Sequence, residues 1–186
     1  PYVLPDNAEY ALLDLNDPLT FNSFYIPGKP DGNLRKFISK GNWGVVDMIG
    51  SIVLLKKNYL SDRRLYRVLD EMPAISHEGL VKVDGNIEFL GYDAIFEKNQ
   101  VRLTLFWKAA EQLKGNYGNF IDILNSNEEV KYRFEKPICY RMYPTYLWQK
   151  GEIVSEDYVV LIPESMKNGY SVKMGVFDYK TGISCS

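Results

Sequence analysis

Hydrophobic and polar residues alternate with a period of two along the C-terminal part of the chain, from Glu78 onward. Alternation of this kind is typical of β-strands that bury one face. Asp-Gly, Lys-Asn, Gly-Asn and Asn-Ser turns separate about eight such stretches, which predicts an antiparallel β-sandwich. The predicted strands cover residues 80–83, 87–96, 101–109, 119–124, 130–134, 138–142, 153–162 and 170–179.

Trp107 lies in one of the clearest of these strands. It shares a face with Leu103 and Leu105, whereas Arg102 and Lys108 lie on the other face. Because the apolar face of a strand is the buried one, Trp107 is expected in the core rather than on a ligand platform.

The N-terminal part has a different pattern. Residues 8–15 are rich in apolar residues and end at Asn16-Asp17-Pro18, which predicts a buried strand that leads into a turn. Residues 43–48 and 51–56 flank Ile49-Gly50, and this arrangement predicts a tight hairpin. Residues 21–32 are expected to be a loop, because prolines and glycines interrupt them at Pro27, Gly28, Pro30 and Gly32.

Two helices are predicted in the same part of the chain. Asn33 is a suitable N-cap for a short helix that ends at Gly41. Ser61 is a suitable N-cap for a second helix, residues 61–72, with apolar residues at helical spacing, and Pro73 ends it. The predicted fold is therefore mainly β, with a small α/β unit and its linking helix in residues 1–72 and the sandwich in residues 73–186.

The composition narrows the classes of function. The chain has 186 residues, of which 46% are hydrophobic, so it can bury a core without a metal or a disulfide. Its 22 basic and 24 acidic residues are spread over both halves, which disfavours nucleic-acid binding. No apolar run approaches the ~20 residues that a membrane span needs. The first residue is Pro1 rather than Met, so we expect a fragment of a longer protein.

The two cysteines, Cys139 and Cys185, do not have the spacing of metal ligands. A disulfide between them would suit an exported domain, and two unrelated thiols are the alternative. We predict no cofactor and no metal.

Four segments of the sandwich carry a resemblance to a known group of proteins. Residues 87–93, 101–109, 144–152 and 169–182 together resemble a β-sandwich appended to some prokaryotic polytopic membrane proteins. Those relatives include glycosyltransferases that use dolichyl- or polyprenyl-phosphate sugars.

The N-terminal part carries a second resemblance. Residues 9–18, 41–46 and 50–56 look like the tail of the extracytoplasmic region in a related, uncharacterised membrane-protein family. The two resemblances imply that the chain is the outward-facing C-terminal portion of a multi-spanning protein. They also imply that the carboxylate for glycosyl transfer lies in a loop absent from this chain, so no catalytic residue is carried over.

Several candidate sites have ordinary explanations. Asp14 and Asp17 bracket a strand end and could hold a metal, but the same residues are common in turns, which we favour. His77 is the only histidine and has no Gly-x-Ser-x-Gly motif as a partner, so we expect a solvent-facing linker residue. The segment 28–32 lacks most of a phosphate-binding motif and is expected to be a surface loop.

An aromatic group is the strongest candidate for a ligand site. Aromatic faces stack on sugar rings, and a sandwich surface can display them. The alternative is that Trp148 closes the edge of the sandwich as part of its packing. The group comprises Tyr140, Tyr143, Tyr146 and Trp148.

These observations predict a non-catalytic accessory domain on the extracytoplasmic face of the cell membrane, tethered by parts absent from this chain. It would cover or orient the membrane-embedded portion of the same parent protein, with glycan or lipid-linked sugar as a further candidate contact. The alternative is a carbohydrate-binding or adhesion β-sandwich. A glycosidase ranks third, because no pair of carboxylates is marked by its setting.

Overall fold

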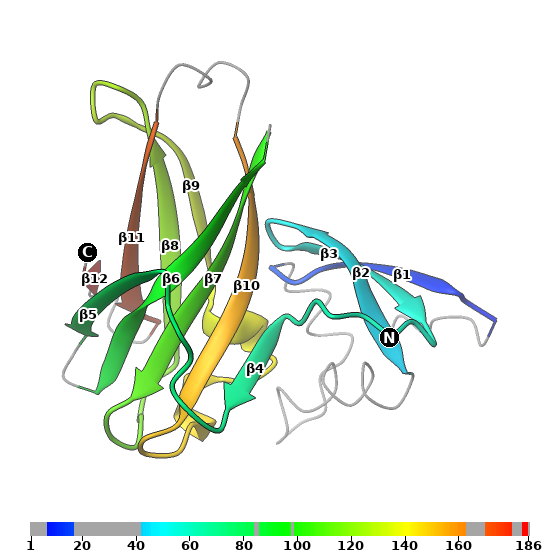
Figure 1. Ribbon diagram of the computed structural model, residues 1–186, viewed down its shortest axis with the longest axis horizontal. Coiled ribbons are helices and arrows are strands. Elements are labelled where there is room, and N and C mark those ends of the chain that lie inside the picture. Colours follow the sequence, from blue (N-terminus) through cyan, green and yellow to red (C-terminus); the bar gives the residue numbers. More distant parts are fainter. Residues whose placement is uncertain are drawn as a thin grey trace.

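The computed structural model describes residues 7–16, 42–83, 86–97, 99–162, 170–179 and 184–185. The strands in these ranges form three antiparallel sheets, of three, five and four strands (Figure 1). The prediction of a mainly β fold is confirmed. No helix in the described ranges is long and apolar enough to cross a bilayer.

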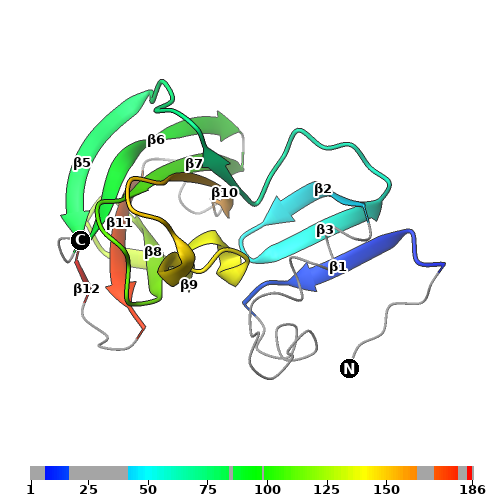
Figure 2. The same cartoon turned by 90° about the horizontal axis from the view of Figure 1, so that it is seen from below.

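The larger two sheets face each other and form what we call the sandwich (Figure 2). Side chains from both sheets make one hydrophobic core, in which Trp107 and Leu105 lie opposite Ile121 and Ile123. The five-stranded sheet has the order β4 (Tyr66–Leu69), β10 (Ile153–Leu161), β7 (Gln100–Ala109), β6 (Ile87–Glu97), β5 (His77–Val83). The four-stranded sheet has the order β12 (Ser184–Cys185), β11 (Ser171–Asp178), β8 (Tyr117–Leu124), β9 (Val130–Pro137).

The third sheet, which we call the small sheet, lies beside the sandwich. Its strand order is β1 (Tyr10–Asp14), β3 (Ile52–Lys57), β2 (Trp43–Ile49). The predicted N-terminal strand and the predicted hairpin are both confirmed. Gly50 in the hairpin turn has a φ of 56°, a conformation that glycine adopts without strain.

The small sheet buries its apolar face against the sandwich. Val53 and Leu55 share a hydrophobic cluster with Tyr140, Met142 and Val159 of the sandwich. The hairpin tip is also tied to the sandwich by a hydrogen bond of 2.8 Å, donated by the Gly50 amide to the carbonyl of Val159. The core of the small sheet is thus completed by another part of the chain.

The predicted helix over residues 61–72 is wrong. This segment is extended, and β4 within it pairs with β10 at the edge of the five-stranded sheet. The Ser61 hydroxyl donates to the carbonyl of Val45 and accepts from the amide of Arg63, so it makes local and cross-chain bonds in place of a helix cap. Pairing with a distant strand overrides the local helical pattern here.

The predicted strand over residues 138–142 is also wrong. Ile138–Arg141 forms a 3₁₀ turn, η1, and Thr145–Leu147 forms a second one, η2. Cys139 and Tyr140 have positive φ values of 54° and 53°, which no strand tolerates. The other expected helix, from Asn33 to Gly41, and the expected loops at 21–32 and 28–32 lie outside the described residues. The described residues between 7 and 72 form the small sheet and, with β4, the edge of the five-stranded sheet, and they contain no α-helix.

Candidate functional site

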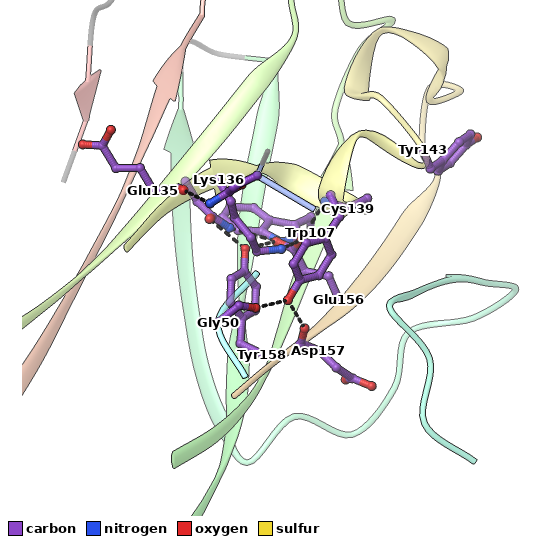
Figure 3. Close-up of polar contacts among 12 residues, drawn as sticks. Gly50, Trp107, Glu135, Lys136, Cys139, Tyr143, Glu156, Asp157 and Tyr158 are labelled. Atoms are coloured by element: carbon purple, nitrogen blue, oxygen red, sulfur yellow. Dashed lines mark hydrogen bonds and ion pairs between the residues drawn. The ribbon is translucent and has the colours of Figure 1, made fainter. Parts of the chain in front are cut away.

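A charged group lies at the centre of the sandwich. The side chain of Glu156, on β10, is 0% exposed, and Lys136, on β9, is 4% exposed. The Lys136 Nζ lies 3.0 Å from the Glu156 Oε2, so the two form a buried ion pair that joins the facing sheets (Figure 3). Buried charges are costly unless they are paired and fully hydrogen-bonded.

The Glu156 carboxylate has donors on both oxygens. Its Oε1 accepts from the Trp107 Nε1 and from the Asn119 Nδ2, each at 2.9 Å. Its Oε2 accepts from the Lys136 Nζ and, at 2.7 Å, from the Cys139 amide. These donors come from β7, β8, β9 and η1, so one carboxylate connects four separate segments. We call Trp107, Asn119, Lys136, Glu156 and Tyr158 the polar cluster.

Tyr158 connects two members of the polar cluster. Its hydroxyl lies 2.7 Å from the Asn119 Oδ1 and 3.2 Å from the Glu156 Oε1. Its ring lies beneath the Lys136 ammonium, with 3.6 Å from Nζ to the ring centroid, and Tyr140 contributes a second ring at 3.1 Å. The cation is therefore held by a carboxylate and by two aromatic faces.

Burial changes the acidity of these groups. Desolvation lowers the pKa of Lys136 to about 8, although the neighbouring Glu156 favours the protonated form. Desolvation also raises the pKa values of Cys139, Tyr140 and Tyr158 well above their usual range. The interior thus shifts all four groups toward their neutral forms. Lys136 stays mostly protonated at neutral pH, but its neutral amine is more accessible than that of an exposed lysine.

A cavity of about 890 Å³ lies between the tip of the β2–β3 hairpin and the strands β9 and β10. Lys136 and Tyr158 of the polar cluster contribute to its lining. Four large hydrophobic side chains that are substantially exposed to solvent also line it, namely Ile49, Ile52, Tyr132 and Leu161. A cavity with apolar walls and a few polar groups is the usual form of a binding site.

The structure divides the predicted aromatic group into two pairs. Tyr140 and Trp148 are fully buried, and the Trp148 indole donates to the carbonyl of Tyr143 at 3.1 Å. Their rings serve the core and are not on the surface. Tyr143 is half-buried, with its hydroxyl donating to the carboxylate of Glu152, and Tyr146 is 37% exposed. Contact with a sugar stays a prediction. In this conformation only Tyr143 and Tyr146 are accessible enough to make it.

The candidates Asp14 and His77 make local contacts that do not require a ligand. The Asp14 carboxylate accepts from the Asn16 amide at 3.0 Å and from the Ser51 hydroxyl at 2.6 Å, as expected of a turn residue, and Asp17 lies outside the described residues. His77 begins β5 instead of lying in a linker, and its ring stacks on Tyr92 at 4.7 Å. Over the described ranges, no group of three or more potential metal ligands comes together.

Cys139 is a free, buried thiol, so the predicted alternative of two unrelated cysteines fits the structure better than the disulfide. Its amide donates to the Glu156 carboxylate of the polar cluster.

The polar cluster was not predicted from the sequence. The signal was present, because Asn119, Lys136 and Glu156 occupy inward positions in strands whose neighbouring inward residues are apolar. Glu156 lies between Val154 and Tyr158 on the buried face of β10. Polar residues at inward positions of an alternating strand are the pattern to look for.

Comparison with known proteins gives no further identification. No protein-family model matches the chain, and no curated protein matches it at a significant level of similarity.

Proposed function

We propose that this chain is a non-catalytic accessory domain that binds, through the cavity beside the hairpin tip, a segment of the membrane-embedded portion of its own parent protein. The observation that carries the proposal is the cavity of about 890 Å³ with four exposed hydrophobic side chains in its lining. Clustered exposed apolar residues mark interaction surfaces on folded domains. The resemblance to sandwiches appended to multi-spanning proteins is what suggests the parent as the partner.

The strands that form the cavity suit a peptide partner. β9 is the last strand in its sheet, and β4 covers only the part of β10 from Ile153 to Glu156. On β10, the Asp157 amide and the carbonyls of Asp157 and Val159 are already hydrogen-bonded to other parts of the chain. The edge of β9 that does not face β8 is the one with which an extended segment can pair, although the Glu135 carbonyl there already accepts from the Asn16 side chain. The apolar side chains of Ile52 and Leu161 would then contact the side chains of that segment.

A photocrosslinking experiment in the parent protein tests this proposal. A benzoylphenylalanine placed at position 52, in the cavity lining, is expected to crosslink to a segment next to a membrane span of the same parent. The matched control has the same amino acid at position 80, because Leu80 is exposed on β5 at the opposite edge of its sheet. The control is expected to give no such crosslink.

Three results would contradict the proposal. They are a parent protein without membrane spans, equal crosslinking from positions 52 and 80, and binding of glycans by the isolated chain that is lost when Tyr146 is changed to alanine. The last result would support the carbohydrate-binding alternative instead.

A further inference from the structure

The polar cluster contains the groups needed to form a covalent bond inside the protein. Asn119 on β8 and Lys136 on β9 are directly opposite each other in the strand register. Side chains at directly opposed positions of an antiparallel pair lie on the same face, with their Cβ atoms about 4.5–5.5 Å apart. The amine of Lys136 and the carboxamide of Asn119 therefore extend into the same buried space.

The Glu156 carboxylate bridges these two groups. One of its oxygens lies 3.0 Å from the Lys136 Nζ, and the other lies 2.9 Å from the Asn119 Nδ2. A carboxyl group in this position can take a proton from the amine and give a proton to the amide nitrogen. On the other side of the amide, the Tyr158 hydroxyl donates to the Asn119 Oδ1 at 2.7 Å, where negative charge would develop during attack on the carbonyl carbon.

We propose that Lys136 and Asn119 react with each other, with Glu156 as the catalytic acid and base, to form an isopeptide bond between β8 and β9. The neutral Lys136 Nζ attacks the Asn119 Cγ, and a bond forms between them. Glu156 accepts the proton from Nζ and delivers one to Nδ2, after which the Cγ–Nδ2 bond breaks and ammonia leaves. The products are one amide between the two side chains and one ammonia, and the reaction needs no other reactant.

The surroundings of the cluster support this reaction. The interior removes water that would hydrate the amine, and the reduced basicity of Lys136 makes the nucleophilic form accessible. Trp107 and Cys139 hold Glu156 in place through hydrogen bonds, so the groups are positioned before reaction. The inference depends on the sandwich interior alone and not on the proposed partner.

Mass spectrometry of the purified chain tests the proposal. The unfolded chain is expected to weigh less than its sequence mass by one ammonia. After trypsin, peptides 115–131 and 134–141 are expected as a single branched species. Trypsin does not cleave between Lys136 and Pro137 whether or not the lysine has reacted, so the second peptide is the same in both cases.

Variants assign the roles of the residues. Glu156→Gln keeps the shape of the side chain but cannot take a proton from the Lys136 amine or give one to the Asn119 amide nitrogen. This variant is expected to have the full mass of its sequence. Lys136→Arg keeps a positive charge beside Glu156 but removes the nucleophilic amine, and it is also expected to have its full sequence mass. This second variant tests the proposal independently if Glu156→Gln does not fold. The matched control is Lys131→Met, an exposed lysine on the same strand, which is expected to lose ammonia as the unchanged chain does.

Three outcomes would overturn the proposal. The first is an unchanged chain with its full sequence mass. The second is a loss of ammonia without the branched peptide, since this would indicate a cyclic imide at one asparagine. The third is a branched peptide that persists in folded Glu156→Gln, because Glu156 would then not be the proton carrier.

Discussion

The sandwich and the small sheet are stabilised in different ways. Six polar or charged residues are buried in the described part of the chain, and all of them lie in the sandwich, between Asn119 and Glu156. The buried side chains of the small sheet, such as Val53 and Leu55, are apolar, and they are completed by side chains of the sandwich. A region with its own large core can accommodate buried polar and charged side chains, whereas a three-stranded sheet needs a neighbour to cover its apolar face.

This difference has a consequence for cooperativity. The small sheet depends on Tyr140, Met142 and Val159, so loss of the sandwich is expected to unfold both regions. Loss of the small sheet removes only one outer layer from the sandwich. The predictions below test this asymmetry, from the largest expected effect to the smallest.

Glu156→Ala is expected to have the largest effect, a loss of about 3–5 kcal/mol in the free energy of unfolding. The change leaves Lys136 as an unpaired buried charge and removes the acceptor for Trp107 and Asn119. Urea unfolding followed by circular dichroism measures the loss. The control is Glu135→Ala on β9 of the facing sheet, where the side chain is exposed and the change is expected to stay within about 0.5 kcal/mol. A loss below about 1 kcal/mol for Glu156→Ala would show that the polar cluster is not a stabilising centre.

Leu55→Ala is expected to cost about 3 kcal/mol, because the side chain is fully buried in the small sheet. The cost should be local. Native-state hydrogen exchange is expected to speed up for amides of β1, β2 and β3 while those of β7 and β8 keep their protection. Leu12→Ala is the matched control, since Leu12 is 70% exposed on β1. Equal loss of protection in both regions would contradict the asymmetry.

Tyr140→Phe is expected to cost about 1 kcal/mol at neutral pH, since the ring is kept and a hydrogen bond is lost. The Tyr140 hydroxyl lies 3.0 Å from the carbonyl of Asp157 and 3.4 Å from that of Gly50, so it contacts both regions. Thermal unfolding measures the loss. An unchanged or higher melting temperature at neutral pH would show that this hydroxyl does not connect the regions.

The same variant is expected to change the alkaline stability. Burial raises the pKa of Tyr140 well above its usual 10.0, so above pH 10 the unfolded chain releases this proton while the folded chain keeps it. The contribution is complete below pH 10 and is lost as the pH rises further, at up to about 1.4 kcal/mol per pH unit and group. Tyr140→Phe is therefore expected to lose stability less steeply between pH 10 and 11. Parallel curves for the two proteins would contradict this expectation.

Calcium is expected to have the smallest effect. The Asp14 Oδ1 already accepts from Asn16 and Ser51, as a turn residue does. Millimolar calcium should leave the melting temperature unchanged, and Asp14→Asn should respond in the same way. A calcium-dependent increase that Asp14→Asn abolishes would point to a metal site at this turn.

The regular parts of the fold were predictable from the sequence. Alternation defines strands such as β7 and β10, and Gly50 marks the hairpin, because these signals are local. The failed helix at residues 61–72 shows the limit, since β4 exists through its pairing with β10, a partner almost ninety positions away. A local pattern that suits a helix cannot reveal such a pairing.

The candidate site was only partly accessible to sequence reasoning. Inward positions of Asn119, Lys136 and Glu156 follow from alternation once the strands are known. The meeting of Asn119 and Lys136 at the Glu156 carboxylate depends on the sheet order and on the strand register, which a single sequence does not specify. The positive φ values at Cys139 and Tyr140, which bring the Cys139 amide to Glu156, also have no local signal such as glycine.

The chain carries an intrinsic fluorophore in each of its two regions. Trp43 is buried in the small sheet, whereas Trp107 and Trp148 are buried in the sandwich, and these are the three tryptophans of the sequence. Subtracting the emission of a Trp43→Phe variant from that of the unchanged chain would isolate the signal of the small sheet, while Trp107 keeps its hydrogen bond to Glu156. Red-shifted emission at low denaturant would then report detachment of that layer in real time, without any attached dye.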